Sequence, residues 1–112
     1  MSTARQHVFL TGGSGYMGSR LIPRLLSRRH RVTALVRPHS QGKLPSGCEA
    51  VLGNALDGSS YRDRIKPATT FVQLVGVSHP SPAKAAEFCS IDLVAGREAI
   101  AAAVSAGMQH LI

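Results

Sequence analysis

The stretch TGGSGYMG, residues 11–18, has four glycines in eight positions and follows the apolar run QHVFL. Residues 6–11 combine β-branched and aromatic side chains, which predicts a short buried strand that ends at the glycines. In residues 16–29 the apolar side chains recur at helical spacing, which predicts a helix in spite of Pro23. That proline removes one backbone donor, so packing must offset its cost or the helix must bend there. The glycines therefore occupy a turn that leads directly from a strand into a helix.

The rest of the chain continues this alternation of strands and helices. The predicted elements are a strand at 31–37, a loop through Gly47, a strand at CEAVLG, a short helix at about 60–66, an apolar strand at 69–77, a long helix at 83–106 capped by Gly107, and the opening of a strand at QHLI. Alternation with apolar strands argues for a parallel sheet covered on both faces by right-handed crossovers. The predicted fold class is α/β, a three-layer parallel sheet in one domain spanning residues 1–112.

Composition limits the function classes. At 112 residues with 44% hydrophobic side chains, the chain is expected to form one globular unit with a modest core. Cys48 and Cys89 lie far apart and form no Cys-x-x-Cys pair, which argues against a structural disulfide or zinc site and favours the reducing cytoplasm. The first apolar run is too short for a signal peptide, and Arg97 and Glu98 interrupt the last apolar segment, so neither export nor a membrane partner is expected. The net charge of +7 favours anionic partners in general.

The glycine spacing has a chemical interpretation in this context. Gly13, Gly15 and Gly18 form GxGxxG, and Gly12, Gly15 and Gly18 form GxxGxxG in the same letters. Such a turn needs a residue that accepts positive φ, a bare backbone that a pyrophosphate can approach, and a small residue where the helix meets the strand. The following helix offers unpaired N–H groups and the positive end of its dipole to the phosphates. Between a predicted strand and a predicted helix, this pattern favours a dinucleotide site over a glycine-rich turn without a ligand.

The end of the second predicted strand bears on the choice of cofactor. An acidic side chain at this place would bind the ribose 2′-hydroxyl of NAD, but the chain has Arg37 there and no Asp or Glu between Gly18 and Glu49. A guanidinium suits a 2′-phosphate, so NADP is favoured over NAD. The alternative is that Arg37 is one of many solvated arginines in a basic chain.

Several motifs together resemble a known family. TGGSGYMG is similar to the TGxxGxxG fingerprint, LLSRRHRVTALVR to LLxxGHxVxxLxR, LGNALD to GDxxD, and IDLVAGREAIAAAVSAGMQHLI to a helix that leads into strand five. These are motifs of the extended and atypical short-chain dehydrogenase/reductases, which include nucleotide-sugar epimerases and NmrA-like proteins. Tyr16 stands where the TGxxxGxG spacing of the other main branch needs a glycine. The resemblance covers nearly the whole chain and implies an NAD(P)-binding domain with a Rossmann-like three-layer sheet of strand order 3-2-1-4.

The resemblance also implies roles for particular residues. It places Gly12, Gly13, Ser14, Gly15, Tyr16 and Met17 around the pyrophosphate, Arg37 at the adenosine ribose or its phosphate, Asn54 and Ala55 beside the adenine, and Val75, Gly76 and Val77 along the riboses. Two positions depart from the family pattern. Asn54 replaces an Asp, and its amide can still accept a hydrogen bond from the adenine amino group. Arg29 replaces a glycine at the end of the first helix, where a left-handed conformation costs roughly 1 kcal/mol.

The family's catalytic motif is absent from the chain. Family enzymes use a YxxxK pair on a later helix and a Ser or Thr at the end of strand five. Tyr16 lies in the glycine turn, and Tyr61 is followed four residues on by Ile65, so no catalytic residue is assigned. We therefore expect an incomplete domain, truncated at the start of strand five. The strand at 69–77 would then expose an apolar edge through which copies of the chain could associate.

Three function classes follow. The leading interpretation is the dinucleotide-binding portion of a short-chain-type oxidoreductase or nucleotide-sugar-epimerase-like enzyme with a small-molecule substrate. The alternative is a non-catalytic NAD(P)-binding regulator or assembly factor of the NmrA-like type. A Ser or Thr followed by YxxxK beyond Ile112 would favour the enzyme, and their absence the regulator.

The third class, a basic nucleic-acid binder, has little support. Arg20, Arg24 and Arg28 recur on one helix face, but no aromatic stacking platform accompanies them, so a solvated helix face is favoured. The five histidines, at positions 7, 30, 39, 79 and 110, are dispersed without a metal-binding pattern, and each is expected to be a loop or surface residue.

Overall fold

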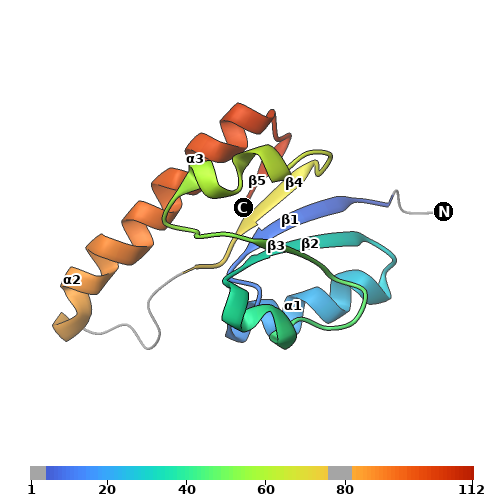
Figure 1. Cartoon of the computed structure of the whole chain (residues 1–112), viewed down its shortest axis with the longest axis horizontal. Coiled ribbons are helices and arrows are strands. Elements are labelled where there is room, and N and C mark those ends of the chain that lie inside the picture. The colour runs from blue at the N-terminus through green and yellow to red at the C-terminus, as the bar shows by residue number, and fades with distance from the viewer. Residues whose placement is uncertain (1–4, 76–81) are drawn as a thin grey trace.

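A five-stranded parallel sheet forms the centre of the computed structural model, which describes residues 5–75 and 82–112 (Figure 1). The strands are β1 (His7–Thr11), β2 (Arg31–Val36), β3 (Glu49–Leu52), β4 (Thr70–Gln73) and β5 (His110–Leu111). Their order is β3-β2-β1-β4-β5, and every neighbouring pair is parallel. The predicted fold class and the order 3-2-1-4 are confirmed, with β5 added beside β4.

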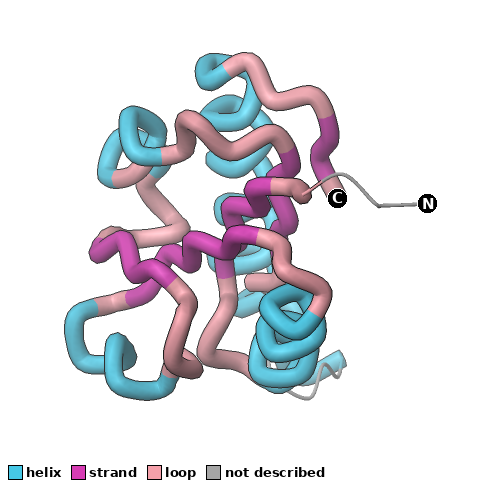
Figure 2. Tube along the Cα trace, turned by 90° about the vertical axis from the view of Figure 1, so that its right-hand side faces the viewer, coloured by secondary structure: helices cyan, strands magenta, loops and turns pink. Residues whose placement is uncertain are grey.

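Helical segments cover both faces of the sheet, and Figure 2 shows the strands between them. The α-helices are α1 (Tyr16–Ser27), α2 (Ala85–Glu87) and α3 (Val94–Ala106); a π-helical turn spans Phe88–Leu93, and 3-10 turns span Pro38–Lys43, Gly58–Ser60, Arg62–Arg64 and Pro82–Lys84. The α1 helix lies on one face of the sheet and α3 on the other (Figure 1). This is the three-layer arrangement that the alternation of elements predicts.

Two apolar clusters hold these layers together. Successive side chains of a strand point to opposite faces, so Val8 and Leu10 pack toward α1, where they meet Ile22. Phe9 points the other way and packs with Tyr61 and the alanines of α3. The rings of Phe9 and Tyr61 are stacked with centroids 5.8 Å apart. The central strand β1 is thus buried on both faces, as its apolar sequence predicts.

Several predicted elements differ in detail from the structure. The helix at 83–106 is interrupted by the π-helical turn, and it ends at Gly107, whose φ of 72° confirms the predicted cap. The short helix at about 60–66 is instead two 3-10 turns, the first begun by the Asp57 side chain, which accepts from the Ser59 backbone N–H. The α1 helix continues through Pro23, as predicted, because packing of its apolar face compensates for the missing donor.

The prediction that the fourth strand exposes an unpaired edge is wrong for the residues that form β4, because β5 pairs with them. Phe71 accepts a hydrogen bond from the Ile112 N–H at 2.9 Å, and the Gln73 N–H donates to the Ile112 carbonyl at 2.9 Å. Even two residues of β5, with the residue that follows, are enough to pair this edge. Within the described residues, β5 and not β4 forms that edge of the sheet.

The chain reverses after α1 through a residue in the left-handed region. Arg29 has φ of 66°, and its N–H donates to the Leu26 carbonyl at 2.9 Å. The His30 N–H donates to the Leu25 carbonyl at 3.0 Å, so the last helical carbonyls are satisfied by this turn. The conformation expected from the family's glycine is therefore kept by an arginine, whose Cβ makes it less favourable.

Replacing Arg29 by glycine should stabilise the fold. Arg29→Gly removes the steric cost of a left-handed arginine and should raise the free energy of unfolding by about 1 kcal/mol, measured by urea denaturation. Gly107→Ala is the matched control, because it puts a Cβ at a second left-handed cap and should lower stability. An Arg29→Gly variant less stable than the parent would contradict this account.

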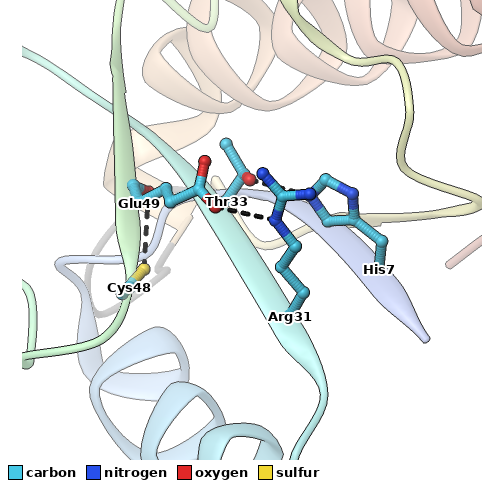
Figure 3. Close-up of polar contacts among 5 residues, drawn as sticks. All are labelled: His7, Arg31, Thr33, Cys48 and Glu49. Atoms are coloured by element: carbon cyan, nitrogen blue, oxygen red, sulfur yellow. Dashed lines mark hydrogen bonds and ion pairs between the residues drawn. The ribbon is translucent and has the colours of Figure 1, made fainter. Parts of the chain in front are cut away.

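A polar cluster lies at the amino edge of the sheet, where β1, β2 and β3 begin (Figure 3). Arg31 Nε donates to Glu49 Oε1 at 2.7 Å, and the His7 ring forms a hydrogen bond with Thr33 Oγ1 at 2.9 Å. Burial, followed by the Arg31 charge, lowers the pKa of His7 below its usual value. The hydrogen bond that Arg31 donates to Glu49 lowers the pKa of the Glu49 carboxyl. These groups are held together by the parallel register of three strands.

The lowered pKa of His7 predicts a pH-dependent stability. As the pH falls from about 7 to about 5, the unfolded chain takes up a proton at His7 before the folded chain does, so the free energy of unfolding decreases. His7→Gln removes this titration and should flatten the dependence in that window, measured by urea unfolding at several pH values. An unchanged slope would show that another group is responsible. The Glu49 contribution is separable, because a carboxyl with a lowered pKa titrates at more acidic pH.

Candidate functional site

Three glycines in and just after the turn that follows β1 are closely packed by the protein itself, Gly12 and Gly18 against backbone atoms and Gly13 against side-chain methyls. Gly12 has φ of 74°, and a Cβ there would lie 2.7 Å from the Leu74 carbonyl carbon. A Cβ on Gly18 would lie 2.5 Å from the Gly13 carbonyl oxygen, and one on Gly13 would lie 3.0 Å from a methyl of Leu10. These positions let the start of α1 press against the ends of β1 and β4.

Gly15 is different, because the protein leaves room for a side chain there. A Cβ on Gly15 would have its nearest neighbour, the Gly12 carbonyl oxygen, at an ordinary 3.4 Å, and its φ is −82°. Gly15 is the N-cap of α1, with no side-chain cap and no acidic residue in the first helical turn. The Gly15 N–H itself donates to the Gly12 carbonyl at 3.1 Å, but the bare backbone and the N–H groups that follow it at the helix start suit an anionic ligand that approaches closely.

A cavity of about 280 Å³ lies beside this turn, at the carboxyl edge of the sheet. Its polar part is formed by Gly12, Ser14, Arg37, His39, Ser40 and Gly53. Its apolar part is formed by Leu35, Val36, Ala55, Leu56, Val75 and Ile91. In open parallel sheets this edge is where ligands bind. The cavity thus offers both hydrogen-bond donors with a positive charge and an apolar surface.

The cavity brings together some of the site residues expected from the sequence. Gly12, Ser14, Arg37, Ala55 and Val75 line it, although they come from the segments after four different strands. Gly13 is buried beneath the turn. Gly76 and Val77 lie outside the described residues.

The start of α1 presents its first side chains to solvent. Gly15, Tyr16 and Met17 are exposed and do not line the cavity. The Tyr16 ring lies against the guanidinium of Arg20, which is one helical turn further along α1. The distance from the ring centroid to Arg20 Cζ is 4.3 Å. At the start of the helix, Tyr16 and Met17 can also offer a ligand at the turn their backbone N–H groups, which have no intrahelical partner there.

Asn54 has a local structural role. Its Oδ1 accepts from the Leu56 N–H at 2.9 Å, and its own N–H donates to Ser60 Oγ at 2.9 Å. These bonds fold the loop after β3 so that Ala55 and Leu56 line the cavity. Asn54 itself borders a shallower neighbouring pocket together with Arg37 and His39.

Sequence reasoning missed other lining residues. His39 and Ser40 belong to the 3-10 turn after β2, a segment expected to be a loop, and His39 was expected to be a surface residue. Ile91 comes from the π-helical turn, far along the chain, and no local signal connects it with the glycines. Gly53 had a signal, since it precedes the GDxxD-like Asn54, and a Cβ there would lie 2.8 Å from a Leu35 methyl.

Other chemistry finds little support among the described residues. In residues 5–75 and 82–112, no group of three or more His, Cys, Asp or Glu side chains could hold a metal ion. No helix in this part of the chain is long and apolar enough to cross a bilayer. Burial raises the pKa of the Cys48 thiol to about 11, so this thiol stays protonated and is a poor nucleophile.

Comparisons with known proteins cover most of the chain. A family model described as NAD(P)H-binding matches residues 12–112. Sterol-4-alpha-carboxylate 3-dehydrogenase (decarboxylating) of Dictyostelium discoideum is 36% identical over 63 residues, which are 54% of this chain and 19% of that protein. The chain therefore spans about a fifth of the length of this curated relative.

Solved structures share the fold. WbmG of Bordetella bronchiseptica in complex with NAD superposes with a TM-score of 0.79 at 22% identity, over 96% of this chain and 36% of that chain. UDP-glucose 4-epimerase of Thermus thermophilus in complex with NAD gives a TM-score of 0.78 at 20% identity, over 94% of this chain and 36% of that chain. Both likenesses confirm the parallel Rossmann-like sheet.

The two kinds of glycine should respond differently to alanine. Gly15→Ala should change stability by about 1 kcal/mol or less, yet weaken NAD(P)H binding at least about tenfold, because its methyl group stands where the ligand must approach. Gly18→Ala should destabilise the fold by about 3 kcal/mol or more, because backbone atoms must move. Fluorescence titration with NADPH and NADH, paired with urea unfolding, checks both. Undiminished binding by Gly15→Ala would remove the ligand argument.

Proposed function

The chain belongs to the NAD(P)H-binding family, and from this premise we propose that it binds the adenosine and pyrophosphate part of NAD(P) for a short-chain-type oxidoreductase or nucleotide-sugar-epimerase-like enzyme. The single observation that carries the proposal is Gly15, where the protein has space for a side chain and lacks one. A pyrophosphate at the start of α1 explains this glycine, since it needs bare backbone and N–H donors.

The polar and the apolar lining residues of the cavity suit the two parts of an adenosine. The adenine would lie against Ala55, Leu56 and Ile91, and the ribose would lie at the end of β2, beside Arg37. Gly12 and Ser14 lead from there to the glycine turn and the pyrophosphate. On this arrangement Asn54 contributes mainly by holding the loop under the adenine, because its side-chain oxygen already accepts from Leu56.

The cofactor we propose is NADP in preference to NAD. Arg37 follows directly after β2 and lines the cavity, and no acidic residue stands near it in sequence to accept from a ribose hydroxyl. A guanidinium donates to phosphate in a bidentate way and has no acceptor for a hydroxyl donor. The side-chain chemistry at this position therefore favours a 2′-phosphate.

The reaction we propose is hydride exchange between the nicotinamide and a small-molecule substrate, the chemistry that the cofactor supplies when bound. The residues of this chain would bind and orient the cofactor. We assign no catalytic residue among them.

The second candidate is a non-catalytic NAD(P)-binding regulator or assembly factor. The glycine turn and the cavity would serve such a protein equally well, since both features bind a cofactor without supplying a catalytic group. Hydride transfer from NADPH by the natural gene product would support the enzyme. Tight NADPH binding with no turnover, and no YxxxK in that product, would support the regulator.

We also propose a cytoplasmic location. The support is the cysteine usage, since Cys48 is a free thiol and the sequence holds no closely spaced cysteine pair. Fractionation of cells that express the protein tests this placement.

Arg37→Ala tests the proposed cofactor preference. The parent should bind NADPH more tightly than NADH, and the variant should lose about ten- to a hundredfold in NADPH affinity while NADH affinity changes by less than about twofold. Dissociation constants from fluorescence titration give both numbers. Equal affinity for the two cofactors in the parent, or the same NADPH affinity before and after the substitution, would rule out the role given to Arg37.

A further inference from the structure

A second side chain stands beside Arg37 in the cavity. Arg37 and His39 both line the main cavity, and both also border the shallower pocket next to Asn54. We propose that His39 acts with Arg37 to determine cofactor selectivity, by donating a hydrogen bond to the 2′-phosphate of the adenosine ribose. This inference rests on the proposed function, that the cavity holds the adenosine end of NAD(P).

The backbone of the 3-10 turn positions His39. The Ser40 N–H donates to the Arg37 carbonyl at 2.9 Å, which closes the turn directly after β2. Ser40 is buried, with 8% of its surface exposed, and it lines the same cavity, so it anchors the turn from within. His39 lies between Arg37 and Ser40 in this turn, and its side chain is exposed. The hydrogen-bonded turn therefore places His39 on the same cavity as Arg37, so little further ordering of the backbone is needed to bring both residues to one ligand.

Both side chains are free to donate. In the described part of the chain, no hydrogen bond or ion pair occupies the Arg37 guanidinium or the His39 ring. The ion pair in this part of the chain joins Arg31 to Glu49, and it lies at the opposite edge of the sheet. No Asp or Glu precedes Glu49 in the sequence, so the turn carries no carboxylate that would compete for these donors.

The chemistry of the two cofactors then makes opposite demands on this turn. A 2′-phosphate offers only acceptor oxygens at neutral pH, which suits a guanidinium and an imidazole N–H. A ribose 2′-hydroxyl is best held by an acceptor such as a carboxylate. The opposing possibility is that the unprotonated ring nitrogen of His39 accepts from that hydroxyl, which would favour NAD. The two roles predict opposite effects of removing the ring.

The test uses probes that differ only in the 2′-phosphate. Adenosine 2′,5′-bisphosphate and 5′-AMP are titrated into the parent chain, His39→Ala and His39→Gln, by calorimetry. His39→Ala should weaken the bisphosphate about tenfold and change 5′-AMP by less than about twofold, because a hydrogen bond to a charged phosphate is lost. His39→Gln keeps a side-chain donor and should recover part of the loss. The same ratio should appear for NADPH against NADH.

His110→Ala is the matched control, because it removes an exposed histidine from β5, outside the cavity. It should leave both affinities unchanged. Equal weakening of bisphosphate and 5′-AMP by His39→Ala would assign His39 to packing and overturn the proposal. A larger loss for 5′-AMP or NADH would overturn it in favour of the acceptor role.

The experiment separates failure of this inference from failure of the proposed function. If the parent binds none of these nucleotides, the proposed function fails and the inference fails with it. If the parent prefers the bisphosphate and Arg37→Ala abolishes that preference while His39→Ala keeps it, only the role of His39 is overturned. Urea unfolding of each variant shows whether the fold is intact.

Discussion

The close approach of backbone to backbone at the glycine turn is the constraint on which the rest of the structure depends. Gly12 lies against the Leu74–Val75 peptide and Gly18 against the carbonyl of Gly13, at distances that leave no space for a Cβ. The Leu74 N–H donates to the Thr11 carbonyl at 3.1 Å, so the same approach extends the pairing of β1 with β4. Because of this contact, α1 starts directly at the carboxyl edge of the sheet, where its N–H groups face outward.

The parallel direction of the strands separates two polar edges with different chemistry. At the amino edge, Arg31 is neutralised by Glu49 and His7 is bonded to Thr33 (Figure 3). At the carboxyl edge, Arg37 and His39 have no acidic partner in the described part of the chain. The first set contributes to folding and its pH dependence. The second set is left with unused donors beside a cavity, which is the condition for binding an anionic ligand.

Periodicity and turn chemistry predicted most of the fold. The runs around Phe9 and Val72, and the helical spacing before Arg29, are long and regular enough to identify strands and helices, and their alternation implies a parallel sheet. The left-handed position of Arg29 was also predictable, because the family pattern has a glycine there. The π-helical turn was not, and the pairing of β5 with β4 closed an edge that the sequence left open. Both depend on contacts between segments far apart in the chain.

The sequence by itself determined the strand-turn-helix unit, the glycine positions and the basic residue after the second strand, because these depend on local periodicity and on residue type. Only the tertiary structure decided which glycine is needed for packing and which leaves room for a ligand, since Gly15 and Gly18 are the same letter in different surroundings. It also decided that His39 and Ile91 belong to one cavity. Such convergence results from the crossovers of a parallel sheet, which bring the ends of separate strands to one edge.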